Sequence, residues 1–166
     1  MLSLEDLKKT KKVLSCACLI TDGEKVLVEL ATGRKYQENN LDLPKGLHED
    51  GESLSETAKR EVFEETGIKV NNLKELGIFK YNSSKNVALT LYYTNELPSL
   101  STMKCDSYFE RDGKKIPEIK GYYYVKPEEL KNLLYKSYNT VFKSFETVYK
   151  MSLAEYIRQL KKNDEI

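Results

Sequence analysis

What this sequence lacks already excludes several classes of protein. Its 27 Lys and Arg residues nearly balance its 26 Asp and Glu residues, so the net charge of +1 provides no global field for binding nucleic acid or an anionic membrane. No apolar run approaches the length of a membrane span, and the charged first residues, MLSLEDLKKTKK, lack the apolar stretch of a secretory signal. We therefore expect a cytoplasmic protein without membrane contacts.

Cysteine is also scarce, with three residues in the chain. Cys16 and Cys18 lie two residues apart in an apolar stretch, which would place both on one face of a strand. Because the thiolate-rich spacing of a zinc site is missing, we predict core thiols rather than a metal or redox role. The alternating Asp/Asn loop of an EF-hand is missing too, which argues against a calcium-binding helix.

The chain has no internal repeat, no low-complexity block and no Pro/Gly/Ser-rich linker. Apolar residues make up 40% of it, which is enough for one buried core, so we predict a single domain over residues 1–166. The terminal helix and the exposed tyrosines leave two interpretations open, because they either cover this core or form a homodimer contact.

Several segments have the composition of β-strands. Residues 13–20 and 25–30 are apolar and are joined by Thr21-Asp22-Gly23, a pattern typical of a hairpin. The other predicted strands are a second hairpin of residues 75–81 and 87–94, and the aromatic segment GYYYV at residues 121–125.

Helix signals are clear in two places. Residues 53–66 predict a helix in which Ser53 is the N-cap, Glu56 completes a capping box and Gly67 ends the helix. Apolar residues at three- to five-residue spacing predict a last helix from about Thr140 to Leu160, and Pro127 suits the first turn of another. Strands and helices do not alternate strictly, which favours a mixed sheet with helices on its faces.

The helix at 53–66 carries an unusual cluster of glutamates. At roughly 100° per residue, Glu61 and Glu65 lie one turn apart on one face, and Glu64 lies within about 100° of them. Like charges at this spacing destabilise an isolated helix by around 0.2–0.5 kcal/mol per pair, so the arrangement needs another reason. Oxygen ligands at this density suit Mg²⁺ or Mn²⁺, and Mg²⁺ commonly shares its ligands with substrate phosphates.

A solvated acidic face is the competing interpretation, with Glu56–Arg60 and Arg60–Glu64 as surface ion pairs. The spacing of the whole stretch decides against it, because residues 46–68 resemble the Nudix box in full. The matching positions are Gly46, Glu52, Arg60, Glu61, Val62, Glu64, Glu65, Gly67 and Ile68. The flanking hairpin, the Leu-Pro-Lys-Gly segment and the later strands and helix also agree with that family.

This resemblance implies an α/β/α sandwich around a mixed β-sheet and a pyrophosphohydrolase that acts on phosphorus-containing anhydrides. It implies that Glu64 and Glu65 are the main ligands of Mg²⁺ or Mn²⁺ and that the carbonyl of Gly46 is a further ligand. Glu61 would be a ligand or the base that activates water. Arg60 would pair with Glu52 and hold the loop on the helix, and we count Arg60 among the candidate catalytic residues.

Further candidates lie outside this stretch. Glu118 stands where many Nudix enzymes carry an additional glutamate that binds metal or activates water, with Glu110 or no residue at all as the alternatives. Lys45 and Arg34 are candidate phosphate contacts. His48, the only histidine, occupies a variable position of the box loop, so we expect a surface residue rather than a base. Candidate residues for stacking on a nucleobase include Tyr36, Tyr81 and Tyr122.

The substrate is less constrained. Markers of some family members some fifteen residues beyond the box, a proline or a tyrosine, are replaced by Asn82 to Lys85. We expect a small nucleotide substrate, either a dinucleoside polyphosphate or a nucleotide sugar such as ADP-ribose. The alternatives are an RNA 5′-end pyrophosphohydrolase, which near-neutral charge does not favour, a diphosphoinositol polyphosphate hydrolase, and a non-catalytic Nudix ligand-binding module. The last alternative is disfavoured because such modules usually lose a box glutamate.

Overall fold

The structure, a computed structural model, describes residues 1–8 and 12–164. Its centre is a six-stranded mixed sheet in the order β4-β5-β1-β2-β8, in which β1 also pairs with β3. β1 runs parallel to β5 and antiparallel to β2 and β3. The strands of this sheet are β1 (Val13–Thr21), β2 (Val26–Ala31), β3 (Lys45–Leu47), β4 (Lys74–Asn82), β5 (Lys85–Tyr93) and β8 (Ile119–Val125).

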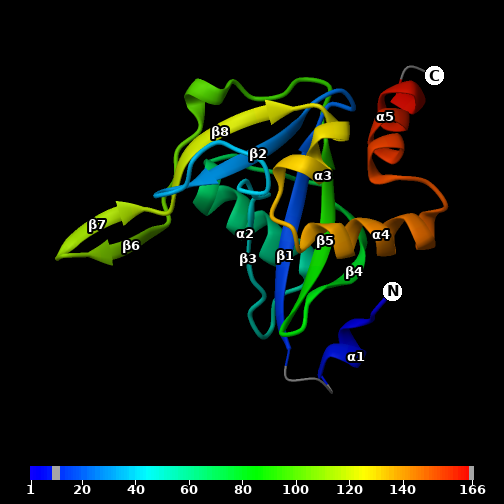
Figure 1. Ribbon diagram of the computed structural model, residues 1–166, viewed down its shortest axis with the longest axis horizontal. Helices are drawn as coiled ribbons and strands as arrows, with labels where there is room; N and C mark the ends of the chain where they lie inside the picture. Colours follow the sequence, from blue (N-terminus) through cyan, green and yellow to red (C-terminus); the bar gives the residue numbers. More distant parts are fainter. Residues whose placement is uncertain (9–11, 165–166) are drawn as a thin grey trace.

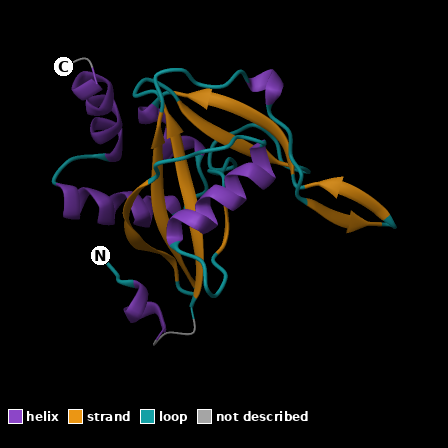
Figure 2. Ribbon diagram, turned by 180° about the vertical axis from the view of Figure 1, so that it is seen from behind, coloured by secondary structure: helices purple, strands orange, loops and turns teal. Residues whose placement is uncertain are grey.

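Helices cover both faces of the sheet, as expected for an α/β/α sandwich. α2 (Leu54–Thr66) lies behind the sheet in Figure 1 and in front of it in Figure 2, whereas α4 (Tyr138–Tyr149) packs on the opposite face. Among the described residues, no helix combines the length and the apolar content needed to cross a bilayer. The shorter or peripheral elements are α1 (Leu4–Lys8), η1 (Leu100–Thr102), η2 (Pro127–Glu129), α3 (Leu130–Leu133) and α5 (Leu153–Asp164).

Both faces of the central strand are buried, which explains its continuous apolar sequence. Ala17 and Leu19 face the cluster below α4 and α5, whereas Cys16 and Cys18 face the α2 side. The prediction that the two cysteines share one buried face is therefore confirmed, and burial raises the pKa of each thiol to about 12.

The two predicted hairpins, the strand at 121–125 and the helix at 53–66 are confirmed. In the first hairpin, the Asp22 carboxylate accepts hydrogen bonds from the N–H groups of Glu24 and Lys25 at 2.9 and 2.8 Å, which fixes the turn. Pro127 opens a short 3₁₀ turn that continues into α3.

The prediction of one helix from Thr140 to Leu160 is wrong. The chain turns after Tyr149, where Lys150 adopts the left-handed conformation with φ 60°, and Ser152 accepts a hydrogen bond from the Glu155 N–H at 3.1 Å to start α5. This turn brings Tyr156 edge-on against Phe145 at 5.5 Å between ring centroids. Apolar residues at this spacing are compatible with one long helix or with two short ones, so the spacing alone does not distinguish them.

A second, two-stranded sheet is present that the sequence pattern does not predict. β6 (Tyr108–Arg111) and β7 (Lys114–Pro117) form an arm that projects from the body of the molecule (Figures 1 and 2). Its turn residues, Asp112 and Gly113, have φ of 52° and 75°, the combination favoured in tight hairpins. The arm lacks the apolar alternation of a buried strand, which is why it was missed.

Candidate active site

The glutamate helix forms for local reasons that the sequence makes visible. The Ser53 hydroxyl accepts a hydrogen bond from the Glu56 N–H, and the Glu56 carboxylate accepts one from the Ser53 N–H. At the other end Gly67 adopts φ 78°, which a residue with a side chain rarely adopts, and its N–H donates to the Phe63 carbonyl. The structural roles predicted for this capping box and for Gly67 are confirmed.

Gly46 and Glu61 meet at the start of the site. A Cβ atom placed on Gly46 would lie 1.9 Å from the carboxyl carbon of Glu61, so only glycine leaves room for this carboxylate. β3 holds Gly46 in place because it pairs with Cys16 of β1, and α2 carries Glu61. Burial raises the pKa of Glu61, so the carboxylate is less stable here than it would be in water.

Arg60 joins the loop to the helix, as expected. Its guanidinium donates to both oxygens of the Glu52 carboxylate at 2.9 Å and to the Leu47 carbonyl at 3.1 Å. A further hydrogen bond of 2.7 Å reaches Glu61, and Thr57 donates to Glu52 at 3.0 Å. The paired hydrogen bonds from Arg60 lower the pKa of Glu52 to about 2.

Glu65 is buried against a residue that the sequence analysis missed. Its carboxylate accepts a hydrogen bond from the Lys45 N–H at 3.0 Å and also contacts Glu29, a buried residue of β2. Burial raises the pKa of both carboxyl groups, and their mutual repulsion adds to the shift for Glu29. One oxygen of Glu29 is buried without a hydrogen-bond partner among the described residues.

A signal for Glu29 was present in the sequence, because a lone glutamate interrupts the apolar run VLVEL on the same face as Leu27. Tyr122, on the neighbouring strand β8, donates from its hydroxyl to the Glu65 carbonyl at 2.5 Å. This contact ties Tyr122 to α2, and stacking of Tyr122 on a nucleobase stays a prediction.

An open cavity of about 320 Å³ lies between these groups. Phe109, at the base of the arm, forms part of its wall. The charged residues that line the cavity are Glu29, Asp42, Lys45, Glu65 and Glu118.

The predicted residue Glu118 therefore comes to the carboxylate cluster although it lies 53 positions after Glu65 in the chain. Its carboxylate accepts a hydrogen bond from Ser107 at 2.9 Å, and its charge contributes to the raised pKa of Glu61. Glu110, the alternative, is exposed on the arm. The position favours Glu118 over Glu110, and its chemical role stays a prediction.

Lys45 lines the cavity, and its ammonium group also contacts neighbouring side chains. It lies 3.4 Å from the Asp42 carboxylate and 4.6 Å from the centre of the Tyr81 ring. Arg34 is not among the cavity-lining residues: its guanidinium donates to Asn40 at 3.3 Å and lies over the Tyr135 ring. A phosphate contact for Arg34 stays a prediction.

Two other candidates are placed differently. Glu64 has a side chain that is 40% exposed and lies 3.6 Å from Arg60, so it faces solvent beside Glu61 rather than the interior. His48 is partly buried, and one of its ring nitrogens lies 2.7 Å from the Glu52 carbonyl oxygen. The side chain therefore contacts the backbone of its own loop.

The residues present fit a divalent cation by their chemistry. Four carboxylates line one cavity, and an oxygen of Glu29 has no hydrogen-bond partner among the described residues. Burial makes the charged forms of Glu61 and Glu65 costly without a nearby cation. Within residues 1–8 and 12–164, no three such side chains are already arranged to hold a metal ion by themselves. Substrate oxygens, water or a shift of the Glu61 carboxylate away from Arg60 would have to complete the site.

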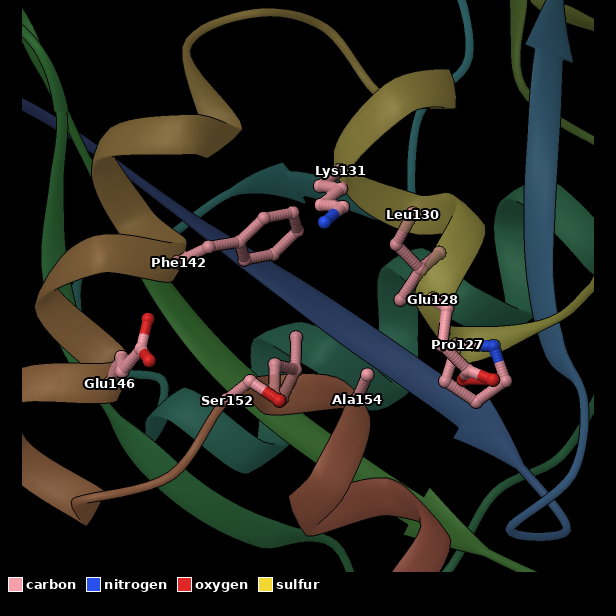
Figure 3. Close-up of a pocket in the computed structure, with 9 residues that line it drawn as sticks. Pro127, Glu128, Leu130, Lys131, Phe142, Glu146, Ser152 and Ala154 are labelled. Carbon is pink, nitrogen blue, oxygen red and sulfur yellow. The ribbon is translucent and has the colours of Figure 1, made fainter.

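A second cavity, of about 350 Å³, shares no lining residue with the carboxylate cavity (Figure 3). It is formed by η2, α3, α4 and the start of α5, with Leu130, Lys131 and Phe142 around it. None of the predicted site residues lines it, so the carboxylate cavity is the candidate active site.

Comparisons with known proteins find similar sequences and similar folds. The family model described as NUDIX domain matches residues 11–145. A relative from Enterobacteria phage T4, the uncharacterized 17.7 kDa protein in the e-segB intergenic region, is 35% identical over 121 residues, which are 67% of this chain and 80% of that protein.

One further relative matches a shorter part of the chain, and one solved structure matches most of it at low identity. The putative 8-oxo-dGTP diphosphatase YtkD of Bacillus subtilis is 34% identical over 79 residues, but these cover 48% of this chain and 49% of that protein. The NUDIX domain of Shewanella oneidensis NrtR, solved as a complex with ADP ribose, has a TM-score of 0.57 at 15% identity and covers 90% of this chain and 98% of its own. At this identity the likeness shows the fold alone.

Proposed function

The chain belongs to the Nudix family of pyrophosphohydrolases, and on that premise we propose that it hydrolyses a pyrophosphate bond in a nucleoside diphosphate linked to a second moiety, with Mg²⁺ or Mn²⁺ as its cofactor. A cytoplasmic location is part of the same proposal.

One observation carries this proposal. The box residue Glu65, the strand residue Glu29 and the distant Glu118 line one cavity. Glu61 lies against Gly46, close enough for the charge of Glu118 to raise its pKa. A diphosphate would be repelled by this many carboxylates, so it binds here only together with cations that neutralise them. A carboxylate cavity of this kind is suited to metal-assisted attack of water on phosphorus.

The protein's own groups have separable tasks. Glu61, Glu64, Glu65 and the Gly46 carbonyl would hold the cation, which when bound lowers the pKa of a water molecule and neutralises phosphate charge. Arg60 and Glu52 fix the loop on the helix, so that Gly46 stays against Glu61.

Glu118 and Lys45, which both line the cavity, have different proposed roles. Glu118, oriented by Ser107, accepts a proton from the attacking water. Lys45 donates to a substrate phosphate oxygen as a charged partner.

For the second moiety we propose a nucleotide or a sugar, as in dinucleoside polyphosphates and ADP-ribose. ADP ribose is the ligand of the NrtR domain, and 8-oxo-dGTP gives the relative YtkD its name, so both belong in the substrate test. RNA 5′ ends and diphosphoinositol polyphosphates are the alternative substrates. A non-catalytic binding module is a second candidate function, and the presence of Glu61, Glu64 and Glu65 argues against it.

The test is a substrate panel with purified protein and Mg²⁺ or Mn²⁺. The panel contains ADP-ribose, diadenosine tri- and tetraphosphate, 8-oxo-dGTP, a 5′-triphosphorylated oligonucleotide and a diphosphoinositol polyphosphate. Products are identified by chromatography, and phosphate is measured after phosphatase treatment. We expect activity that disappears with excess chelator and falls at least about 10²-fold in Glu64→Gln and Glu65→Gln.

The matched control is Glu56→Gln on the same helix. Glu56 belongs to the capping box, which glutamine also completes, and it does not line the cavity. Glu56→Gln is expected to keep full activity. All three variants are expected to keep the circular dichroism spectrum of the wild type. Hydrolysis that persists in chelator, or in Glu65→Gln, would contradict the proposed mechanism, and an inactive wild-type protein that still binds a nucleotide would favour the binding module.

A further inference from the structure

The arm formed by β6 and β7 is built onto the catalytic helix. The Asp106 N–H donates to the Glu64 carbonyl at 2.6 Å, and the Lys104 N–H donates to the Thr66 carbonyl at 3.0 Å. On the other strand, the Glu118 N–H donates to the Ser107 carbonyl at 2.8 Å, which closes the base of the arm. The two strands therefore leave the body directly beside the groups that hold the diphosphate.

The two faces of the arm differ in charge. Directly paired residues of an antiparallel ribbon share a face. The pairs Tyr108–Pro117 and Glu110–Lys115 form one face. The negative charge of Glu110 balances the positive charge of Lys115 there, and the Lys115 ammonium group lies 4.6 Å from the centre of the Tyr108 ring.

The opposite face is formed by the pairs Phe109–Ile116 and Arg111–Lys114. It has two cations and no carboxylate, and neither cation takes part in an ion pair within residues 1–8 and 12–164. Arg111 lies over the Phe109 ring at 5.3 Å. We call these four residues the cationic face of the arm.

This arrangement has a cost without a ligand. Like charges directly opposite each other destabilise a β-ribbon, and an isolated two-stranded ribbon is marginally stable in water. An anion between Arg111 and Lys114 removes the repulsion. The face is continuous with the active site, because Phe109 also lines the carboxylate cavity. Arg111 follows two residues later, about 6.7 Å further along the strand.

We propose that the cationic face is a subsite for a second nucleotide, attached beyond the scissile diphosphate of a dinucleoside polyphosphate. The inference rests on the proposed function. The base stacks on Phe109, and a phosphate group outside the carboxylate cavity is bound by Arg111 and Lys114. A nucleotide sugar such as ADP-ribose has no second base or third phosphate, so it cannot use this subsite.

The test compares diadenosine tetraphosphate with ADP-ribose in the wild-type protein and in the double variant Arg111→Gln/Lys114→Gln. Loss of two charge-assisted contacts to phosphate lowers kcat/KM for diadenosine tetraphosphate at least about tenfold, mainly through KM. The value for ADP-ribose changes less than about twofold. Phe109→Leu, which keeps an apolar contact with Ile116, lowers kcat/KM for the dinucleotide about fivefold or more.

Lys115→Gln is the matched control, because it removes one positive charge from the opposite face of the same arm. It is expected to leave both substrates unaffected. An equal loss for both substrates in the double variant, or no loss for either, overturns the subsite. A loss confined to a 5′-triphosphorylated oligonucleotide also overturns it and assigns the face to RNA.

Binding separates this inference from the proposed function. Titration calorimetry with a methylene-bridged, non-hydrolysable diadenosine tetraphosphate and Mg²⁺ measures the subsite without catalysis. A dissociation constant at least about tenfold higher in the double variant supports the subsite even if the wild-type protein hydrolyses nothing in the panel. An unchanged dissociation constant overturns the subsite even if hydrolysis is found.

Discussion

The contact between Gly46 and Glu61 provides a sharp test of the active-site geometry. In Gly46→Ala, the new Cβ atom would lie 1.9 Å from the carboxyl carbon of Glu61 and 2.1 and 2.3 Å from its oxygens. The carboxyl group therefore has to move by roughly 1 Å or more to reach an ordinary van der Waals distance. Because it is the far end of a flexible side chain, the movement costs little stability, and we expect a loss below about 1.5 kcal/mol.

Activity should respond much more strongly than stability. A displacement of about 1 Å in a catalytic group can reduce the rate by about 10²-fold, and loss of an electrostatic contact costs a similar factor. We therefore expect kcat/KM of Gly46→Ala to fall about 10²-fold. The assay is metal-dependent hydrolysis of the best substrate from the panel, together with urea unfolding of the same preparations.

Gly51→Ala provides the contrasting control. Gly51 lies in the same loop with φ 89°, and no atom lies within 4 Å of an added Cβ. Alanine there is strained by about 1–2 kcal/mol but displaces no site residue, so stability falls and kcat/KM does not.

A double-mutant cycle then isolates the effect of displacing the carboxylate. In a Glu61→Gln background the amide still meets the new Cβ atom, but the carboxylate is already absent, so Gly46→Ala should lower the remaining activity less than about threefold. Additive losses, or a Gly46→Ala protein with wild-type activity, would refute the geometry described here.

Three further predictions concern buried or paired charges. Hydrogen bonds from Arg60 lower the pKa of Glu52 from 4.5 to about 2, so its contribution is fully present above pH 4.5 and is lost as the pH falls toward 2. The stability difference between wild type and Glu52→Gln, measured by urea unfolding, should therefore shrink over that range, and a constant difference would argue against the ion pair. Burial next to Lys45 lowers the pKa of Lys85 from 10.5 to about 8, so the folded state binds fewer protons and stability rises with pH between 8 and 10.5. At pH 7 the free energy of unfolding should be higher for Lys85→Met than for the wild type, and the difference should become smaller by pH 10. One oxygen of Glu29 is buried near other carboxyl groups and has no hydrogen-bond partner among the described residues. Glu29→Gln should therefore raise Tm in chelator by about 2–4 °C, equivalent to about 1 kcal/mol. A lower Tm in calorimetry would show that the Glu29 carboxyl group makes a favourable contact there.

Much of the fold follows from local signals. The Asp-Gly turn, the capping box at Ser53 and the αL glycine at 67 each specify their own backbone conformation, so the hairpin and the helix could be predicted without tertiary contacts. The terminal helix could not, because apolar spacing is compatible with one helix or two. The structure has two helices, and Tyr156 of the second packs on Phe145 of the first.

The site divides in the same way. The spacing of Glu61, Glu64 and Glu65 is a property of one helix and is visible in the sequence, as is the pairing of Arg60 with Glu52 that the family resemblance implied. By contrast, Glu29 was a single acid in an apolar strand, with no motif around it.

The sequence itself therefore determined the glutamate helix and its caps, because a helix places residues one turn apart whatever surrounds it. The same spacing identified the family. Only the tertiary structure decided which distant residues join it. β2 places Glu29 against Glu65, β3 presses Gly46 onto Glu61, and the base of the arm brings Glu118 and Phe109 to the same cavity. These contacts depend on strand order in the sheet, and strand order is set by the packing of the whole chain rather than by any one segment.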